Sequence, residues 1–177
     1  MENFPLLYTE RILLRKIDID DVPSLVKYAN NKKISDNILN MVYPYQEPDA
    51  VFRISYVVQG FKNKTRYVFA IILKSSGEFI GEIGLHLNND RNAAELGYWV
   101  GEPFWNKGIA TEAATLVLKF GFEKLGLGIV FATCHAENES SSKVVSKNGM
   151  MPKKVQGNVI QYILTKQAYD EKIMNRP

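Results

Sequence analysis

The chain has 177 residues, 46% hydrophobic and 23% charged, which is typical of one globular domain spanning residues 1–177 and excludes a disordered or fibrous protein. Its net charge of +3, from 22 basic and 19 acidic residues, permits an anionic ligand but is too small to indicate direct nucleic-acid binding. With one cysteine and two histidines in the sequence, we expect no disulfide and no metal site. We find no secretory signal and no apolar run of ~18–20 residues, so we expect no membrane partner and a cytoplasmic location.

The first third of the chain predicts a strand and two helices. Isoleucine and leucine dominate the first segment, which is typical of a strand. Aspartates followed by Pro23 form a helix start, and Asp49 can cap a second helix. The stretch Asn30–Pro48 is polar and rich in turn residues. The expected elements are a strand at Arg11–Ile17, a helix from Asp20 to Tyr28 and a helix from Asp49 to Phe61.

Three strand-like segments follow, separated only by short polar turns. Such spacing predicts an antiparallel meander, because antiparallel neighbours need only a tight turn between them. These strands are Tyr67–Leu73, Phe79–Leu87 and Ala94–Val100.

The last part of the chain alternates helices and strands. A helical repeat with one narrow polar stripe comes first, and an apolar run of strand length follows it, consistent with a central buried strand. The expected elements are a helix at Ile109–Lys124, a strand at Ile129–Cys134, a short helix capped by Asn138 or Ser140 that stops at Asn148-Gly149, a strand at Val159–Thr165 that closes the sheet, and a helix at Gln167–Met174. The class is therefore α+β, with helices on both faces of the sheet.

The segment Trp99–Ala113, WVGEPFWNKGIATEA, predicts an anion site. A strand ends there, and a helix begins just after Gly108. The first amides of a helix lack internal partners and carry a partial positive charge. Gly108 permits close approach of a ligand, and Lys107 adds charge, so the segment suits a pyrophosphate. Neither common nucleotide loop, G-x-x-x-x-G-K-[ST] or G-x-G-x-x-G, is present.

Three blocks resemble the GNAT superfamily of acetyl-CoA-dependent N-acetyltransferases. They match, in order and spacing, the branch that contains the Rim-type ribosomal-protein N-terminal acetyltransferases. The opening Thr9–Ile17 is similar to the first strand of these proteins, and the resemblance extends from about Leu7 to Thr165. The blocks are AELGYWV at Ala94–Val100, FWNKGIATEA at Phe104–Ala113, and N-x-x-S-x-x-V-x-x-K-x-G at Asn138–Gly149.

The resemblance implies a fold and a cofactor site. The fold would be a mixed, mostly antiparallel sheet of six to seven strands, with the fourth and fifth strands splayed around acetyl-CoA. The strand residues expected to pair with the pantetheine arm are Tyr98, Trp99 and Val100. The residues expected to hold the pyrophosphate are Asn106, Lys107, Gly108, Ile109, Ala110 and Thr111. Trp105 departs from the pattern, because many family members have Gln or Arg there.

Acetyl transfer to an amine needs a proton acceptor and a hydrogen-bond donor for the departing thiolate. Glu95 is the candidate base, because it interrupts an apolar strand and the family places carboxylates on that strand near the acceptor. The alternatives are an exposed Glu95 paired with Arg91 or a lysine, and Glu82 or an ordered water as the base.

The resemblance assigns Asn138 to the pantetheine arm and Ser141 to the thioester sulfur, although both residues also fit helix caps. Many family members carry a tyrosine acid four residues beyond the serine, where this chain has Val145. Ser141 is then left to solvate the thiolate. Lys143 and Lys147 are candidates for the adenosine or 3′-phosphate end, and the alternative is that both are solvated lysines on a helix surface.

The sequence thus predicts an enzyme that moves the acetyl group directly from acetyl-CoA to a primary amine. The acceptor is a protein N-terminal α-amine or a small-molecule amine, and residues Asn30–Phe61 should shape its site. The alternative is a non-catalytic sensor that binds acyl-CoA. The oligomeric state stays open, a homodimer included.

Overall fold

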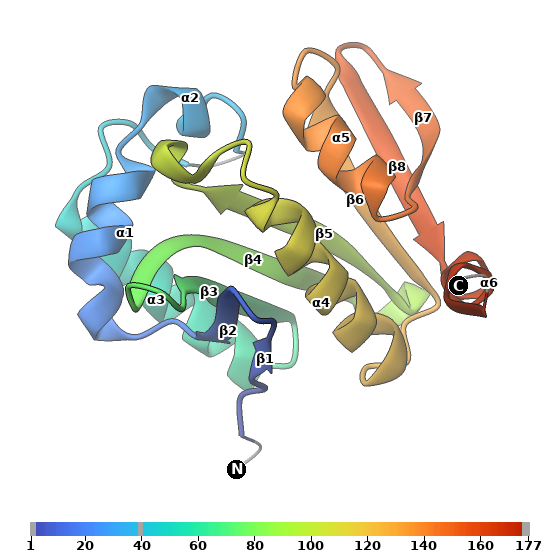
Figure 1. Cartoon of the computed structure of the whole chain (residues 1–177), viewed down its shortest axis with the longest axis horizontal. Coiled ribbons are helices and arrows are strands. Elements are labelled where there is room, and N and C mark those ends of the chain that lie inside the picture. Colours follow the sequence, from blue (N-terminus) through green and yellow to red (C-terminus); the bar gives the residue numbers. More distant parts are fainter. Residues whose placement is uncertain (1–2, 39–40, 175–177) are drawn as a thin grey trace.

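The computed structural model describes residues 3–38 and 41–174, which are arranged around one eight-stranded sheet of order β1-β2-β3-β4-β5-β6-β8-β7 (Figure 1). The strands are β1 (Leu7–Tyr8), β2 (Ile12–Lys16), β3 (Arg66–Leu73), β4 (Glu78–Asn88), β5 (Ala93–Val100), β6 (Ile129–His135), β7 (Met151–Gln156) and β8 (Val159–Thr165). The helices are α1 (Val22–Ala29), α2 (Lys32–Ser35), α3 (Glu47–Lys62), α4 (Ile109–Glu123), α5 (Glu139–Lys147) and α6 (Lys166–Met174).

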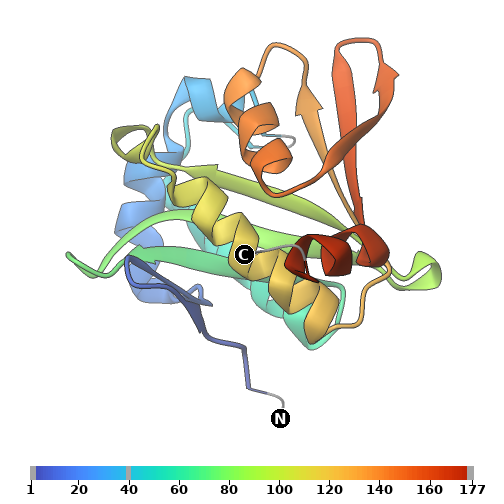
Figure 2. The ribbon, with the colours of Figure 1, turned by 45° about the vertical axis from the view of Figure 1, so that its right-hand side comes forward.

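Strands β3, β4 and β5 form the antiparallel meander that the sequence predicts. Strand β6 then returns parallel to β5, with α4 as the crossover. The parallel pairing covers only Ala93–Glu95 against Ile129–Phe131. Beyond it the two strands diverge (Figure 2), while β6 pairs with β8 along its whole length, Ile129–His135. The splay expected between these strands is therefore confirmed.

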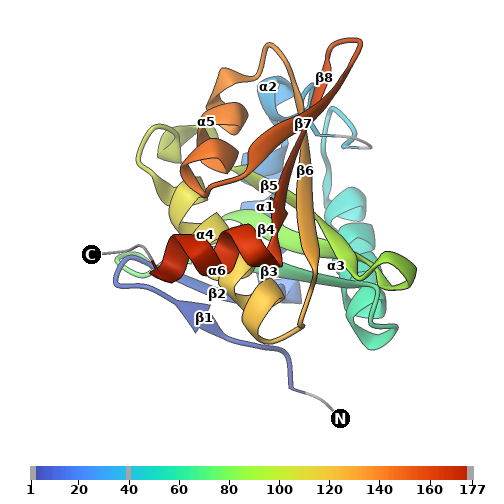
Figure 3. The same cartoon turned by 90° about the vertical axis from the view of Figure 1, so that its right-hand side faces the viewer.

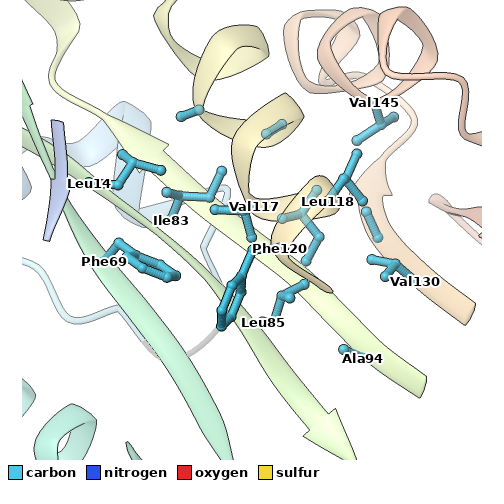
Figure 4. Close-up of a cluster of buried hydrophobic side chains, with 14 of the residues drawn as sticks. Leu14, Phe69, Ile83, Leu85, Ala94, Val117, Leu118, Phe120, Val130 and Val145 are labelled. Atoms are coloured by element: carbon cyan, nitrogen blue, oxygen red, sulfur yellow. The ribbon is translucent and has the colours of Figure 1, made fainter. Parts of the chain in front are cut away.

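Helices cover both faces of the sheet, as predicted. Helices α4, α5 and α6 share one face with strand residues such as Phe69, Ile83 and Val130, and Figure 4 shows this cluster. Helices α1 and α3 cover the other face, where Val68 and Trp99 pack against them. We call these the α4 face and the α3 face. On the α4 face α6 lies beside α4 (Figure 3). Its Tyr169 ring stacks on Phe122 of α4, with ring centroids 4.7 Å apart.

The sheet has eight strands instead of the expected six to seven. Strand β7 was missed, and because it pairs outside β8, Val159–Thr165 does not close the sheet. Every residue of β7 is exposed, so its sequence, MPKKVQ, lacks the apolar alternation by which strands are recognised. Strand β1 has only two residues and α2 only four, too few for a periodic pattern. No described helix combines the length and the apolar character that crossing a bilayer requires.

Candidate active site

The loop between β5 and α4 has the backbone geometry of an anion site. Asn106 and Gly108 both adopt positive φ, 59° and 75°, and Gly108 is the N-cap of the 15-residue helix α4. The amides that follow Gly108 belong to the first turn, where no intrahelical acceptor exists. Small residues at the start of α4 leave these amides accessible to a phosphate.

Arg11 of the β1–β2 turn holds this loop in place. Its guanidinium donates 3.1 Å to the Lys107 carbonyl and 2.8 Å from Nε to Glu112, with which it also forms a salt bridge. The Thr9 hydroxyl donates to the same Glu112 carboxylate. Arg11 was expected only as the first residue of a strand. The contact joins residues 96 positions apart, so no local pattern could reveal it.

Trp105 contacts the strand expected to bind the pantetheine arm. Its indole N–H donates to the Val100 carbonyl at 2.6 Å. The aromatic residue that departs from the family pattern therefore closes the end of β5 and fixes the start of the phosphate loop. The preceding turn is tied to α2, because Glu102 accepts a hydrogen bond from Asn31 at 2.6 Å and pairs with Lys33.

Tyr98, Cys134 and Ser141 meet across the splay. The Ser141 Oγ lies 2.8 Å from the Tyr98 hydroxyl and 3.2 Å from the Cys134 Sγ. Burial raises the pKa of the Tyr98 phenol and of the Cys134 thiol, so both keep their protons at neutral pH. The Tyr98 phenol and the Cys134 thiol can each donate a hydrogen bond to Ser141 Oγ, which has two acceptor positions. The serine's own hydroxyl proton is then available for a third partner.

Only the backbone of Tyr98 was expected to take part in the site, so its hydroxyl contact with Ser141 was not predicted. The contact joins β5 to the start of α5, 43 positions apart. Val145, which stands where many relatives have a tyrosine, is fully buried in the core on the α4 face. The phenol that contacts Ser141 thus comes from Tyr98 of β5 and not from α5.

Asn138 caps α5, as its position predicts. Its Oδ1 accepts 3.0 Å from the Ser141 amide, and its Nδ2 donates 3.0 Å to Asn37. Lys147 is exposed at the other end of α5. The ligand roles expected for Asn138 and Lys147 stay predictions.

Asn148, which was expected only to end a helix, joins α4 to α5. It is 5% exposed, accepts 2.8 Å from the Thr115 hydroxyl and donates to the carbonyls of Thr111 and Val144. These bonds tie the first turns of α4 to the end of α5. The two walls that carry the loop and Ser141 are thereby fixed relative to each other.

Glu95 lies on the opposite face of β5 from Tyr98. Alternate strand residues point to opposite faces, and Ala94, Leu96 and Tyr98 all face α4. Glu95 is half-buried, and among the described residues it has no ion pair, so the pairing with Arg91 is absent. Its cross-strand partner in β4 is His86. The candidate base and Ser141 therefore approach the splay from opposite faces.

His86 is held neutral. Burial, with the positive charges of Arg53 and Arg66, lowers its pKa from 6.5 to about 4. Because the unfolded chain binds this proton more readily, the free energy of unfolding should fall as pH drops from 6.5 towards 4, by at most about 3 kcal/mol. We expect His86→Gln to remove this part of the slope in urea unfolding across that range. Parallel profiles for the variant and the wild type would contradict the assignment.

A polar hollow of about 530 Å³ lies beside the splay, between the residues that follow α2 and the end of β6. Asp36 and Asn37 line one side, and His135, Glu137 and Asn138 line the other. The Asn37–Asn138 hydrogen bond bridges these two sides. Within residues 3–38 and 41–174, no group of three His, Cys, Asp or Glu side chains could hold a metal ion.

Comparisons with known proteins agree with this geometry. Residues 11–151 match the family model described as an acetyltransferase (GNAT) domain. The chain is 33% identical over 144 residues to the uncharacterized N-acetyltransferase p20 of Bacillus licheniformis, a match that covers 79% of each protein.

Two solved structures share the fold over nearly their whole length. An acetyltransferase (GNAT family) from Bacillus anthracis superposes with a TM-score of 0.80 at 25% identity and covers 92% of this chain and 99% of its own. Mycobacterium smegmatis RimJ, in complex with CoA-disulfide, superposes with a TM-score of 0.82 at 19% identity, covering 97% of this chain and 94% of its own.

Proposed function

Because the chain belongs to the GNAT acetyltransferase family, close to its Rim branch, and is therefore an acyltransferase, we propose that it transfers an acetyl group directly from acetyl-CoA to a primary amine. One observation carries the proposal: the edge of β5 that β6 leaves free is followed, after the loop of residues 101–108, by the first amides of α4. We further propose that a single domain performs this reaction in the cytoplasm.

The residues at the splay fit acetyl-CoA. The edge of β5 that β6 leaves at Leu96 offers backbone groups of Tyr98 and Val100 to the pantetheine amides, as an added strand would. At Val100 the Trp105 indole already occupies the carbonyl, so the pairing there would use the amide or require Trp105 to turn away. The turn at Gly108 points the first amides of α4 at the pyrophosphate, and Lys107 adds positive charge.

Two side chains would serve the transfer from opposite faces. Glu95 would take the proton of the acceptor ammonium, since the amine can attack only with a free lone pair. As the carbon–nitrogen bond forms and the carbon–sulfur bond breaks, Ser141 would donate its hydroxyl hydrogen bond to the departing thiolate. Tyr98 would donate a hydrogen bond to Ser141 Oγ and so hold the serine hydroxyl in place. Because the pKa of the Tyr98 phenol is raised, the phenol is too weak an acid to transfer its proton to the thiolate.

The acceptor would reach the splay through the polar hollow. Asp36, Glu137 and Glu139 line it, which favours a positively charged amine over an anion. Two of these carboxylates are paired with lysines of their own helices, Lys32 and Lys143. The hollow accommodates either a small amine or the N-terminus of a peptide, so both acceptor classes stay within the proposal.

Thiol release from acetyl-CoA with a panel of amines tests the proposed function. The panel should contain short peptides with free α-amines together with alkylamines, diamines and aminoglycosides. We expect release that depends on the amine and on the protein. Binding of acetyl-CoA without release for any amine would favour the sensor, and absence of binding would contradict both.

A further inference from the structure

The segment Asn31–Asn37, which contains α2, is bonded to both sides of the splay. At its first residue, Asn31 Nδ2 donates 2.6 Å to Glu102 in the turn that follows β5. At its last residue, Asn37 Oδ1 accepts 3.0 Å from Asn138 Nδ2 at the start of α5. We call this segment the strap, because it joins the cofactor-loop side to the α5 side, which the diverging strands β5 and β6 leave apart.

The first anchor of the strap is built into the start of α2. Asn31 is the N-cap of α2, and its Oδ1 accepts 2.9 Å from the Lys33 amide while its Nδ2 reaches Glu102. Lys33 also forms a salt bridge with Glu102. The hydrogen bonds from Lys33 and Asn31 lower the pKa of the Glu102 carboxyl, which therefore stays charged at neutral pH. Tyr28 of α1 packs edge-to-face on Phe104 of the same turn, with ring centroids 5.4 Å apart.

The second anchor ends on a residue of the expected cofactor site. A side-chain amide has two donor and two acceptor positions. In Asn138 the Ser141 amide occupies one acceptor position and Asn37 occupies one donor position. These two bonds fix the plane of the Asn138 amide and leave one donor for the pantetheine arm, the role that the resemblance assigns to this residue.

The strap is also one wall of the polar hollow. Its Asp36 and Asn37 line the side that faces the end of β6 and the start of α5. Between the two anchors, Ile34 is 4% exposed and packs into the core on the α3 face. Of the residues that the structure describes, those that line the hollow do not include Lys33 or Glu102. One anchor of this wall therefore lies outside the hollow.

We propose that the strap positions the acceptor, because its anchor at Glu102 sets where Asp36 and Asn37 stand over the splay and so determines the affinity for the amine. The inference rests on the proposed function, in which the amine enters through the hollow. Lys33 and Glu102 are positioning residues in this scheme, since they act through the strap. A wall that is ordered before the amine arrives removes part of the entropic cost of binding it.

The test measures KM for alaninamide and for butylamine, by thiol release from acetyl-CoA, in Glu102→Ala. This substitution removes both bonds of the first anchor, so KM for the amine should rise about five- to twentyfold. The value of kcat should change by about twofold at most, since neither Glu95 nor Ser141 is touched. Isothermal titration should show an unchanged affinity for acetyl-CoA, because Glu102 precedes the residues expected to hold the pyrophosphate.

Lys33→Gln and Lys32→Gln form a matched pair. The two lysines are neighbours in α2, their side chains are 68% and 67% exposed, and each pairs with one carboxylate. Lys33 pairs with Glu102 across the anchor, whereas Lys32 pairs with Asp36 inside the strap. Each substitution removes one positive charge, so a direct electrostatic effect on a cationic amine would lower KM in both. We expect KM to rise about two- to fivefold in Lys33→Gln alone, and Lys33→Arg to restore it.

The outcomes separate the two levels of the proposal. No turnover of any amine by the wild type would overturn the proposed function and this inference with it. Turnover with an unchanged amine KM in both Glu102→Ala and Lys33→Gln would overturn the inference alone. An equal rise in Lys32→Gln would also overturn it, because the cause would then be a general loosening of α2. A loss of acetyl-CoA affinity in Glu102→Ala would do the same, because the turn would then act on the cofactor loop.

The exposed Lys33 keeps the inference testable should Glu102→Ala fail to fold. A rise of the amine KM in Glu102→Ala without one in Lys33→Gln would still support the strap, with the Asn31 hydrogen bond as the part of the anchor that matters.

Discussion

Replacement of Gly108 by valine should weaken coenzyme A binding by at least about tenfold while the fold survives. The added Cβ meets only Arg11 at 3.7 Å, so the substitution causes no clash in the core. The φ of 75° is the difficulty, because a β-branched residue resists the left-handed region. Either the backbone turns and carries the α4 amides away from the pyrophosphate, or the side chain stands in front of them. Isothermal titration with coenzyme A measures the loss.

Gly126→Val is the matched control for this experiment. Gly126 follows the other end of α4, has a φ of 68°, and a Cβ added there would meet nothing within 4 Å. The two variants therefore carry the same kind of backbone strain, roughly 1–2 kcal/mol or more each. Only Gly108→Val should lose affinity. An unchanged dissociation constant in Gly108→Val would remove the phosphate-loop assignment, and equal losses in both variants would trace the effect to general destabilisation.

The elements that could be predicted from the sequence are those whose buried apolar residues recur at regular spacing along the chain. The meander β3–β5 and helix α4 contribute most of their apolar residues to the core, so their repeats are visible in the chain. Strand β7 is exposed along its whole length and pairs only with β8, so nothing in its own composition marks it as a strand. It forms because β8 offers a free edge, which is a property of the assembled sheet.

The candidate site likewise contains features that the local sequence predicts and contacts that it does not predict. Gly108 is the N-cap of α4 and Asn138 is the N-cap of α5. A cap is determined by the residues next to it in the chain, so both could be predicted from the sequence. The contact of Tyr98 with Ser141 depends on how β5 and α5 face each other, and the Arg53–Glu82 pair depends on where α3 crosses the sheet. Tertiary contacts of this kind join positions whose local sequences carry no sign of each other.

The two proposed catalytic side chains should differ in their response to pH. Glu95→Gln should lower kcat/KM at neutral pH and recover towards the wild type as pH rises past the α-amino pKa of about 8. Above that pH the solvent supplies the free amine, so a missing base matters less. Profiles of kcat/KM from about pH 6.5 to 9.5 measure the effect. A Glu95→Gln profile parallel to the wild type would make Glu95 a structural or orienting residue, and Glu82 or an ordered water the better base.

Ser141→Ala should show a deficit that persists across the same pH range. Deprotonating the acceptor does not replace a hydrogen bond to the thiolate, so the loss should stay at roughly 1–3 kcal/mol. Tyr98→Phe should give the same flat shape with a smaller deficit, because Ser141 keeps its hydroxyl but loses its 2.8 Å neighbour. Acetyl-CoA affinity should be unchanged in Glu95→Gln and Ser141→Ala, since neither side chain holds the pyrophosphate. A Ser141→Ala deficit that vanished at high pH would instead place the serine on the path of the amine proton.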